Sequence, residues 1–373
     1  MEKIVDTLLW AAILQGLLLG LLYIFSRKHS SLANKLLGFF LLAFVLEALT
    51  NVSVDKIGEY SVNGYFTLLE AKLLLPVLFL HYVLEKLGRA SKYRSFLKIH
   101  YVFAFGFLSI TFLNILLFLL KGKNIYQLFD FHDIEMVFMF MQYYAFFLTL
   151  AAIAISMREI LKYTSLIKNT YSDMDMLQIR WLWYLIWGLV PIVLVWGLEL
   201  IRIANGGTGS STFSSLTWLL LIAFIYFISF RAYQQKNLFE DIVQRSEEKG
   251  KEDFSTKKSD PQEHLKLGKE LTSYMKSSEI YLQNSLTLYE LSRAINIPPR
   301  LISACINQNF RNNFAEWVNS FRVEAAMSKL KDPSFSHLSV EGIGLESGFT
   351  SRSAMYSAFK KQTGHSPGHF RKA

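Results

Sequence analysis

Apolar residues in the first two thirds of the chain occur in runs too long for the helices of an ordinary soluble domain. Seven such runs precede residue 235, and each is close to the ~20 residues that a helix needs to cross ~30 Å of hydrocarbon. The second run is the weakest because Glu47 interrupts it. The runs cover residues 4–25, 34–51, 66–87, 99–120, 134–157, 181–203 and 213–233. The pattern predicts a seven-helix transmembrane bundle within residues 1–235.

The pattern changes after the last run. Residues 236–262 are polar, carry charges of both signs and contain almost no large apolar residues. Such a segment cannot bury enough surface to fold alone, so we expect a flexible linker. Residues 263–373 contain short amphipathic segments with helical spacing. The predicted fold class is therefore all-α, with the transmembrane bundle followed by a small all-helical domain.

Two helix-turn-helix motifs are predicted in this last segment, at about residues 287–308 and 339–363. Thr287 and Glu290 have the spacing of a capping box at the start of the first motif. In the second motif Ser339 caps a helix, and Gly348 supplies the left-handed residue that ends it. A long amphipathic helix between the motifs carries an apolar stripe of Phe314, Trp317, Val318, Phe321, Ala325 and Leu330. A connector of this kind would place the second helix of each motif in successive turns of a DNA major groove.

The outward faces of those second helices carry polar and basic side chains. These residue types suit the reading of base edges, and an arginine early in such a helix is well placed for it. The candidates for base contacts are Arg300, Ser303, Asn307, Arg352, Ser353, Tyr356 and Ser357. The candidates for phosphate contacts are Lys360, Lys361, Arg371 and Lys372.

Charge sets the expected orientation in the membrane. The chain is 52% hydrophobic and 18% charged, below the roughly 25% charged residues of soluble domains. Of the short loops, one alternate set carries about twelve Lys and Arg residues and the other carries five. Loops rich in Lys and Arg face the cytoplasm, so we expect the N-terminus outside and residues 236–373 inside. The net charge of +9 fits an anionic partner but also a basic membrane protein.

Ionisable residues inside the apolar runs are candidates for a sensor pocket because charges in lipid are costly. Five of them fall toward the outer half of the predicted bundle: Glu47, Glu70, Lys72, Glu199 and Arg202. The alternative is that they form structural ion pairs or extend to the interface. His81 and His100 lie near the cytoplasmic ends of their runs, where we expect them to be interfacial.

Few residues suggest metal, redox or enzyme chemistry. The single cysteine, Cys305, lies on the inward side of its predicted helix, as a small core residue would. No Cys/His cluster has metal-ligand spacing, and we find no P-loop, nucleophile elbow or kinase signature. We therefore expect no metal, no cofactor and no enzymatic activity.

Two stretches carry a family resemblance, LTLYELSRAINIPPRLISACINQNFRNNFAEWVNSFRVEAAMSKL and GFTSRSAMYSAFKKQTGHSPGHFRK. Roughly the last 100 residues resemble the DNA-binding domain of AraC/XylS-type transcriptional regulators. The resemblance implies two helix-turn-helix motifs joined by a helix, and double-stranded promoter DNA as partner. The chain departs from the family pattern at Gly342 and Gly344, where alanine is usual, which should weaken that helix by roughly 1 kcal/mol each. Ala304 and Asn307 stand where family members often carry Arg and Lys.

The whole chain also resembles membrane-integrated members of that family. The resulting expectation is a multi-pass protein of the inner (cytoplasmic) membrane that regulates transcription, with the lipid bilayer as a second partner. The membrane half would sense an external or membrane signal, and a signal ligand and a homodimer are left open. The alternative is a membrane transporter or membrane enzyme with a regulatory helix-turn-helix domain.

Overall fold

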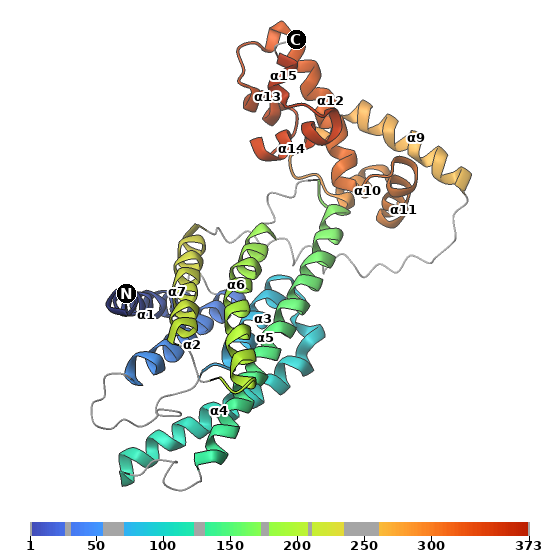
Figure 1. Ribbon diagram of the computed structural model, residues 1–373. Coiled ribbons are helices and arrows are strands. Elements are labelled where there is room, and N and C mark those ends of the chain that lie inside the picture. Colours follow the sequence, from blue (N-terminus) through green and yellow to red (C-terminus); the bar gives the residue numbers. More distant parts are fainter. Residues whose placement is uncertain are drawn as a thin grey trace. The chain divides into compact units, whose positions relative to one another are not determined.

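The structure is a computed structural model that describes residues 2–26, 31–54, 71–122, 131–172, 179–207, 211–234 and 261–371 (Figure 1). Every regular element in these ranges is a helix, apart from an isolated β-bridge between Tyr171 and Thr287. The all-α fold expected from the sequence is confirmed. The chain forms two compact units, an N-terminal unit of Met1–Ile160 and Arg180–Asn237, and a C-terminal unit of Leu161–Ile179 and Leu238–Ala373.

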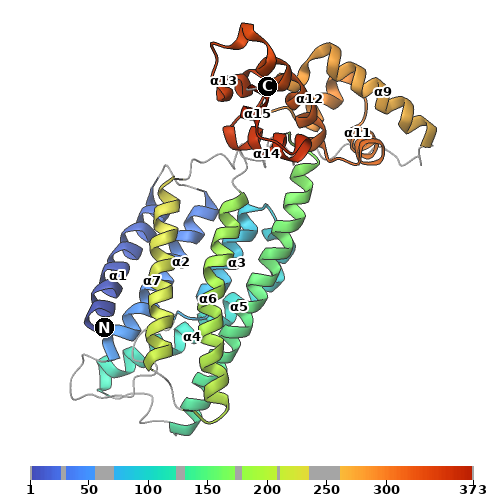
Figure 2. The ribbon, with the colours of Figure 1, turned by 45° about the horizontal axis from the view of Figure 1, so that its top comes forward.

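The N-terminal unit is built from long apolar helices. In chain order they are α1 (Glu2–Phe25), α2 (Leu32–Val54), α3 (Leu74–Lys86), α4 (Arg94–Lys121), α5 (Phe131–Lys168), α6 (Ile179–Ala204) and α7 (Ser211–Gln234). Helix α1 packs against both α2 and α7 (Figure 2). Glycines allow α1 and α2 to approach closely, since a Cβ on Gly38 would lie 2.8 Å from the carbonyl oxygen of Gly20.

The count of seven membrane-spanning helices is not confirmed. Within the described residues, five helices are long and apolar enough to cross a membrane: Thr7–Phe25, Leu32–Leu49, Ala90–Lys121, Met136–Lys168 and Trp181–Ala204. Helix α3 has only 13 residues, and the apolar part of α7 covers Ser215–Ile228. The start of the run predicted at residues 66–87 lies outside the described residues.

The C-terminal unit contains the two predicted helix-turn-helix motifs. It comprises α9 (Pro261–Ser278), η5 (Ile280–Leu282), α10 (Leu288–Ile295), α11 (Pro299–Cys305), η6 (Ile306–Phe310), α12 (Phe314–Lys331), η7 (Pro333–Phe335), α13 (Val340–Glu346), α14 (Arg352–Thr363) and α15 (Pro367–Arg371). Helices α10 and α11 form the first motif, and α13 and α14 form the second. The predicted linker, residues 236–262, falls outside the described residues except for its last two positions, which begin α9.

The local signals in the sequence explain where these helices begin and end. The capping box of Thr287 and Glu290 is present at the start of α10. The hydroxyl of Ser339 accepts a hydrogen bond from the Gly342 amide at the start of α13. Gly348 follows α13 with φ of +89°, a left-handed conformation that favours glycine. A Cβ at Gly348 would also lie 2.6 Å from the carbonyl oxygen of Tyr281.

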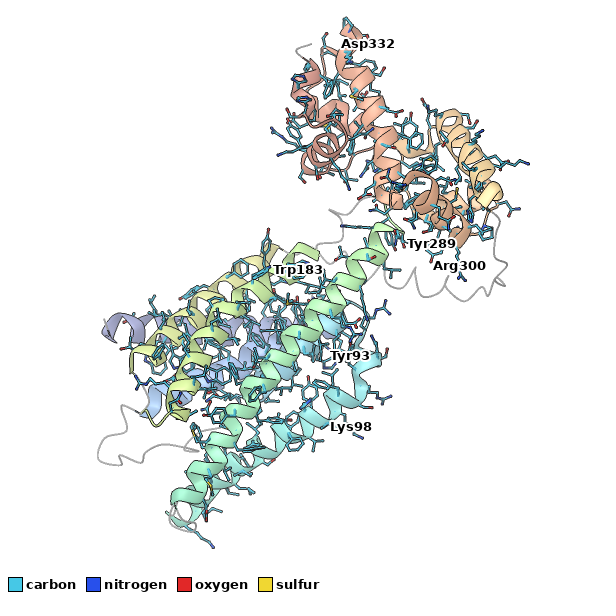
Figure 3. The ribbon with its side chains drawn as sticks, turned by 45° about the vertical axis from the view of Figure 1, so that its right-hand side comes forward. Tyr93, Lys98, Trp183, Tyr289, Arg300 and Asp332 are labelled. Atoms are coloured by element: carbon cyan, nitrogen blue, oxygen red, sulfur yellow. The ribbon has the colours of Figure 1, made fainter. Side chains whose placement is uncertain are left out.

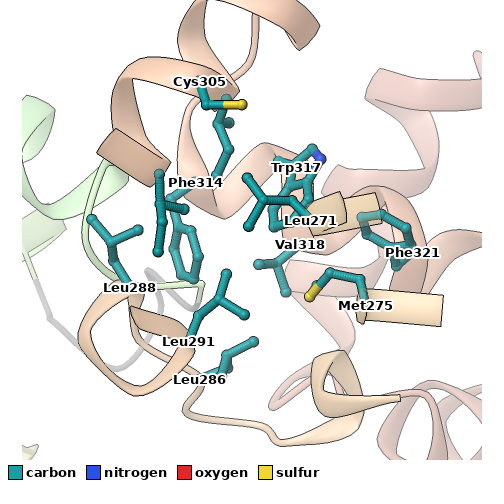
Figure 4. Packing of buried hydrophobic residues seen from close by; sticks show 12 residues of the cluster. Leu271, Met275, Leu286, Leu288, Leu291, Cys305, Phe314, Trp317, Val318 and Phe321 are labelled. Atoms are coloured by element: carbon teal, nitrogen blue, oxygen red, sulfur yellow. The ribbon is translucent and has the colours of Figure 1, made fainter. Parts of the chain in front are cut away.

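Helix α12 contributes to two hydrophobic cores. Its first half packs with α9, α10 and α11 through Phe314, Trp317 and Val318 (Figure 4). Its second half packs with α13 and α14 through Val323, Ala326 and Leu330. The predicted stripe is therefore wrong at one position, because Ala326 is buried and Ala325 is only half-buried. The buried face of α12 changes along its length because its two halves pack in different hydrophobic cores.

Candidate nucleic-acid interface

Helix α14 presents most of the predicted base-reading residues. The hydroxyl of Ser351 caps it by accepting from the Ala354 amide at 3.1 Å. Met355 and Phe359 are fully buried and fix which side of the helix faces the core. The opposite side is open to solvent and carries Arg352, Ser353, Ser357 and Lys360, with Tyr356 half-buried at its edge. The helix thus offers a polar face of the kind predicted from the sequence.

Arg352 is held in place by two neighbours. Its Nη1 lies 3.0 Å from Oε1 of Glu341 on α13, and its guanidinium carbon lies 5.0 Å from the centre of the Tyr356 ring. Both partners of the ion pair are largely exposed, so the pair is worth less than about 1 kcal/mol. Arg352 can therefore exchange the carboxylate for a base edge at small cost.

The predicted phosphate contacts differ in their surroundings. Lys360 is exposed, and its side chain has no ion pair or hydrogen bond within residues 261–371. Lys361 pairs with Glu316 at the start of α12. Arg371 donates to the carbonyl oxygens of Ser336 and Leu338 at 2.9 and 2.7 Å. Lys372 lies outside the described residues. Lys361 thus ties α14 to α12, and Arg371 ties α15 to the segment that precedes α13.

Glu316 serves both as a helix cap and as an ion-pair partner. Burial alone would raise the pKa of its carboxyl, but the hydrogen bond from Lys361 and those from Asn313 outweigh burial and hold the pKa below its usual value. The carboxylate accepts from the Asn313 amide at 3.3 Å, which completes the capping box of α12. The ionised form is therefore favoured in the folded domain.

The second helix of the first motif, α11, is shorter than α14 and is followed by a different turn. Arg300 is exposed at the start of α11 (Figure 3), and Ser303 is half-buried in its middle. The chain then widens into the π-type turn η6, which ends at Arg311 with φ of +53°. Asn307 is exposed on this turn, so its direction follows the turn rather than the α-helical face assumed from the sequence.

Cys305 lies at the end of α11 and is buried, as predicted. Its thiol is 3.4 Å from the carbonyl oxygen of His264 on α9. Burial raises the pKa of the Cys305 thiol, and the hydrogen bond from Asn309 offsets this only in part. The protonated, unreactive form is favoured, which fits a core residue.

A contact missed from the sequence joins the segment after α5 to the first motif. The Leu288 amide donates to the carbonyl oxygen of Thr170 at 2.8 Å, and the Ser172 amide donates to that of Leu286 at 3.1 Å. Leu288 is the first residue of α10, and an amide at that position has no acceptor within its own helix. We call residues 170–172 the docking segment, because they supply the acceptor that α10 lacks.

Arg322 holds the same region together from within α12. This side chain is 1% exposed and donates to the carbonyl oxygens of Tyr281 and Gln283, both at 2.7 Å. It also donates to Oγ of Ser172 at 3.0 Å. Arg322 is not among the residues predicted from the sequence, although its spacing of four from Val318 puts it on the buried face of α12. A buried arginine needs such acceptors, so that spacing was an available signal.

The predicted sensor residues lie in different surroundings. Lys72 Nζ is 3.1 Å from Oε1 of the buried Glu47 and 5.6 Å from the centre of the Phe138 ring. This is an ion pair, one of the two alternatives for these charges. Glu199 and Arg202 are half-buried near the end of α6, and Glu70 lies outside the described residues. The outer pocket stays a prediction.

Comparison with known families identifies residues 291–373 of the C-terminal unit. Residues 291–373 match the family model described as "Helix-turn-helix domain". They form an AraC-type helix-turn-helix domain. This domain indicates DNA binding and regulation of transcription, and the apolar helices of the N-terminal unit suggest membrane insertion.

Two further comparisons add little. The comparison with curated proteins gave no match. Among solved structures, part of the chain is similar to a protein with unknown function from Listeria innocua, at 24% sequence identity and a TM-score of 0.24. That similarity covers 28% of this chain and 93% of the other chain. A score this low supports no argument about arrangement or function.

Proposed function

We propose that this protein is a membrane-bound, sequence-specific DNA-binding transcription regulator. The AraC-type domain with its exposed α14 face is the observation that carries the proposal. Five helices able to cross a membrane support the attachment of this domain to a bilayer. The distribution of Lys and Arg among the loops supports an outer N-terminus and a cytoplasmic DNA-binding domain in a multi-pass protein of the inner membrane.

In the proposed complex α14 enters the major groove. Arg352 leaves Glu341 and donates to a base edge, and a guanidinium suits the two acceptors of guanine. Tyr356 supports the guanidinium from one side through the contact seen in the unbound domain. Lys360 neutralises a phosphate without reading sequence. Arg300 and Asn307 of the first motif lie on exposed surface and contact an adjacent stretch of groove.

The docking segment gives the membrane half a route to the DNA-binding domain. Helix α5 begins in the N-terminal unit and ends at Lys168, two residues before Thr170. We propose that an external or membrane signal shifts α5 and thereby loosens or tightens the hold of residues 170–172 on α10. The hydrogen bonds at Leu288 and Ser172 support this route, because they join α10 directly to the chain that leaves α5.

The test is DNA binding by the intact chain in lipid nanodiscs. Genomic sites bound by the protein are mapped first, and affinity for the recovered fragments is then measured at several salt concentrations. Lys360→Gln should weaken binding to all sequences and lower the slope of log affinity against log salt by about one. Arg352→Ala should cost about 1–3 kcal/mol, or roughly 5- to 150-fold, and relax the preference at one base pair.

The matched control is Lys269→Gln, which removes one exposed charge from α9 instead of from a recognition helix. It should leave sequence preference unchanged. Absence of binding at low salt would contradict the proposal, as would an Arg352→Ala variant with unaltered affinity and preference.

A further inference from the structure

A cavity of about 730 Å³ lies in the N-terminal unit where α3, η2 (Ala90–Tyr93) and α4 meet. One part of its lining is apolar and comes from α4, including Leu97, Val102 and Phe105. Another part is polar and basic, with Ser91 from η2 and Arg94 and Lys98 from the first turns of α4. The cavity is therefore amphipathic along α4.

Within the described part of the chain, the two cations of the cavity have no acidic partner. Arg94 and Lys98 are one helical turn apart and exposed, and neither side chain forms an ion pair or hydrogen bond with a residue that the structure describes. The neighbouring Lys92 behaves differently, because its Nζ lies 2.9 Å from Oε1 of Glu159 on α5. Among the described residues, the charges of Arg94 and Lys98 thus remain uncompensated in the lining of the cavity. Figure 3 labels Lys98 and the nearby Tyr93.

The remainder of the cavity suits a hydrocarbon chain. Helix α4 belongs to the candidate membrane span Ala90–Lys121. Gly106 opens the wall, since a Cβ at this position would meet no atom within 4 Å. Most of the accessible surface that lines this space is apolar, so in a membrane-inserted chain a hydrocarbon chain covers it more favourably than water does.

We propose that this cavity binds an anionic phospholipid of the cytoplasmic leaflet. The phosphate lies between Arg94 and Lys98, and an acyl chain runs along Val102, Phe105 and Gly106. Basic pockets between transmembrane helices on the cytoplasmic side recognise anionic headgroups in this way. A small anion would satisfy the cations but leave the apolar wall uncovered. The proposal rests on the membrane insertion of the proposed function and not on DNA binding.

The cavity is also connected to α5 through hydrogen bonds of η2. Its η2 edge carries Lys92 and Tyr93, and both donate to Oε1 of Glu159, which is 2% exposed. Glu159 belongs to α5, the helix that leads to the docking segment. A lipid seated against η2 therefore contacts the element that holds α5 in place.

The experiment measures lipid binding to the intact purified chain by native mass spectrometry. Phosphatidylglycerol and phosphatidylcholine with the same acyl chains are titrated into the protein in a neutral detergent. One cation near a membrane surface raises the affinity for an anionic lipid about fivefold, so Arg94 and Lys98 together should favour phosphatidylglycerol over phosphatidylcholine by about 30-fold. The double variant Arg94→Gln/Lys98→Gln should lose this preference.

Two further variants separate the headgroup from the chain. Arg158→Gln/Lys168→Gln removes the same charge from exposed positions on α5, outside the cavity, and should keep the preference. Gly106→Leu should fill the cavity and weaken both lipids together without changing their ratio. Inorganic phosphate at millimolar concentration should not displace phosphatidylglycerol, because it cannot cover the apolar wall.

Equal binding of the two lipids would overturn the proposal. So would equal loss of preference in the α5 control, which would indicate general surface charge, or displacement by phosphate, which would indicate a small-anion site. DNA binding is measured on the same samples. A chain that binds DNA but shows no lipid preference refutes only the lipid site, whereas lipid preference without DNA binding refutes only the proposed regulator.

Discussion

Substitution of Ser172 by proline tests whether the docking segment stabilises the start of α10. Proline has no amide hydrogen, so the 3.1 Å hydrogen bond to the Leu286 carbonyl is lost. The side-chain acceptor for Arg322, at 3.0 Å, is lost as well.

The expected size follows from these two contacts. A neutral hydrogen bond contributes about 0.5–1.5 kcal/mol, and one from a charged donor about 1.5–3 kcal/mol. Arg322 keeps its carbonyl acceptors at Tyr281 and Gln283, so the combined loss should fall near the lower end, at about 2–3 kcal/mol. That corresponds to roughly 30- to 150-fold more frequent opening of the contact.

Amide hydrogen exchange at Leu288 is the appropriate assay, because this amide donates to Thr170 within the docking segment. The intact chain in nanodiscs should show exchange at Leu288 accelerated by that factor in Ser172→Pro. Ser172→Ala keeps the amide and should show a smaller increase. Ser165→Ala, an exposed position on α5, is the control and should show none. Unchanged exchange at Leu288 in Ser172→Pro would show that the docking segment does not stabilise the start of α10.

Two further predictions concern the stability of the DNA-binding domain. Gly342→Ala should raise the free energy of unfolding by about 0.5–1 kcal/mol, because a Cβ at this position would meet only ordinary contacts. Gly344→Ala should raise it little, since its Cβ would lie 2.5 Å from the Met355 sulfur. Equal gains for the two variants in urea unfolding would contradict this difference. The lowered pKa of Glu316 contributes stability above the ordinary carboxyl pKa of about 4.3, and that contribution is lost as pH falls through the lower folded-state value. Because Lys361 is largely exposed, this contribution should be below about 1 kcal/mol. Between about pH 5 and pH 3 the melting temperature of Glu316→Gln should fall less than the melting temperature of the wild type. An equal fall in the two proteins would contradict a stabilising ion pair between Glu316 and Lys361.

Local features of the DNA-binding domain could be predicted from the sequence because they depend on neighbouring residues. The capping box of Thr287 and Glu290 spans three positions, and its geometry follows from the residue types alone. The exposed face of α14 follows from the spacing of Met355 and Phe359, which point into one core. The residues of the candidate interface on α14 could therefore be predicted without knowledge of any tertiary contact.

Contacts between distant residues could not be predicted in this way. Lys361 looks like a phosphate ligand from its position on α14, but its ion pair joins it to a residue 45 positions earlier. The docking segment binds α10 through backbone groups, which every residue type except proline offers as both donor and acceptor. No side-chain pattern distinguishes such a segment. The effect of an alanine at Gly344 could not be predicted either, since it depends on how closely Met355 packs against this position.

The shared use of α12 by two cores determines how the DNA-binding domain can be divided. A chain cut after Lys331 would leave Val323, Ala326 and Leu330 without the helices that cover them. A chain begun at Val340 would lack these same residues, and with them one wall of the core around Phe349. Neither helix-turn-helix motif is therefore a separable module. Loss of either core removes support from the same helix, so the two motifs should unfold in one cooperative transition.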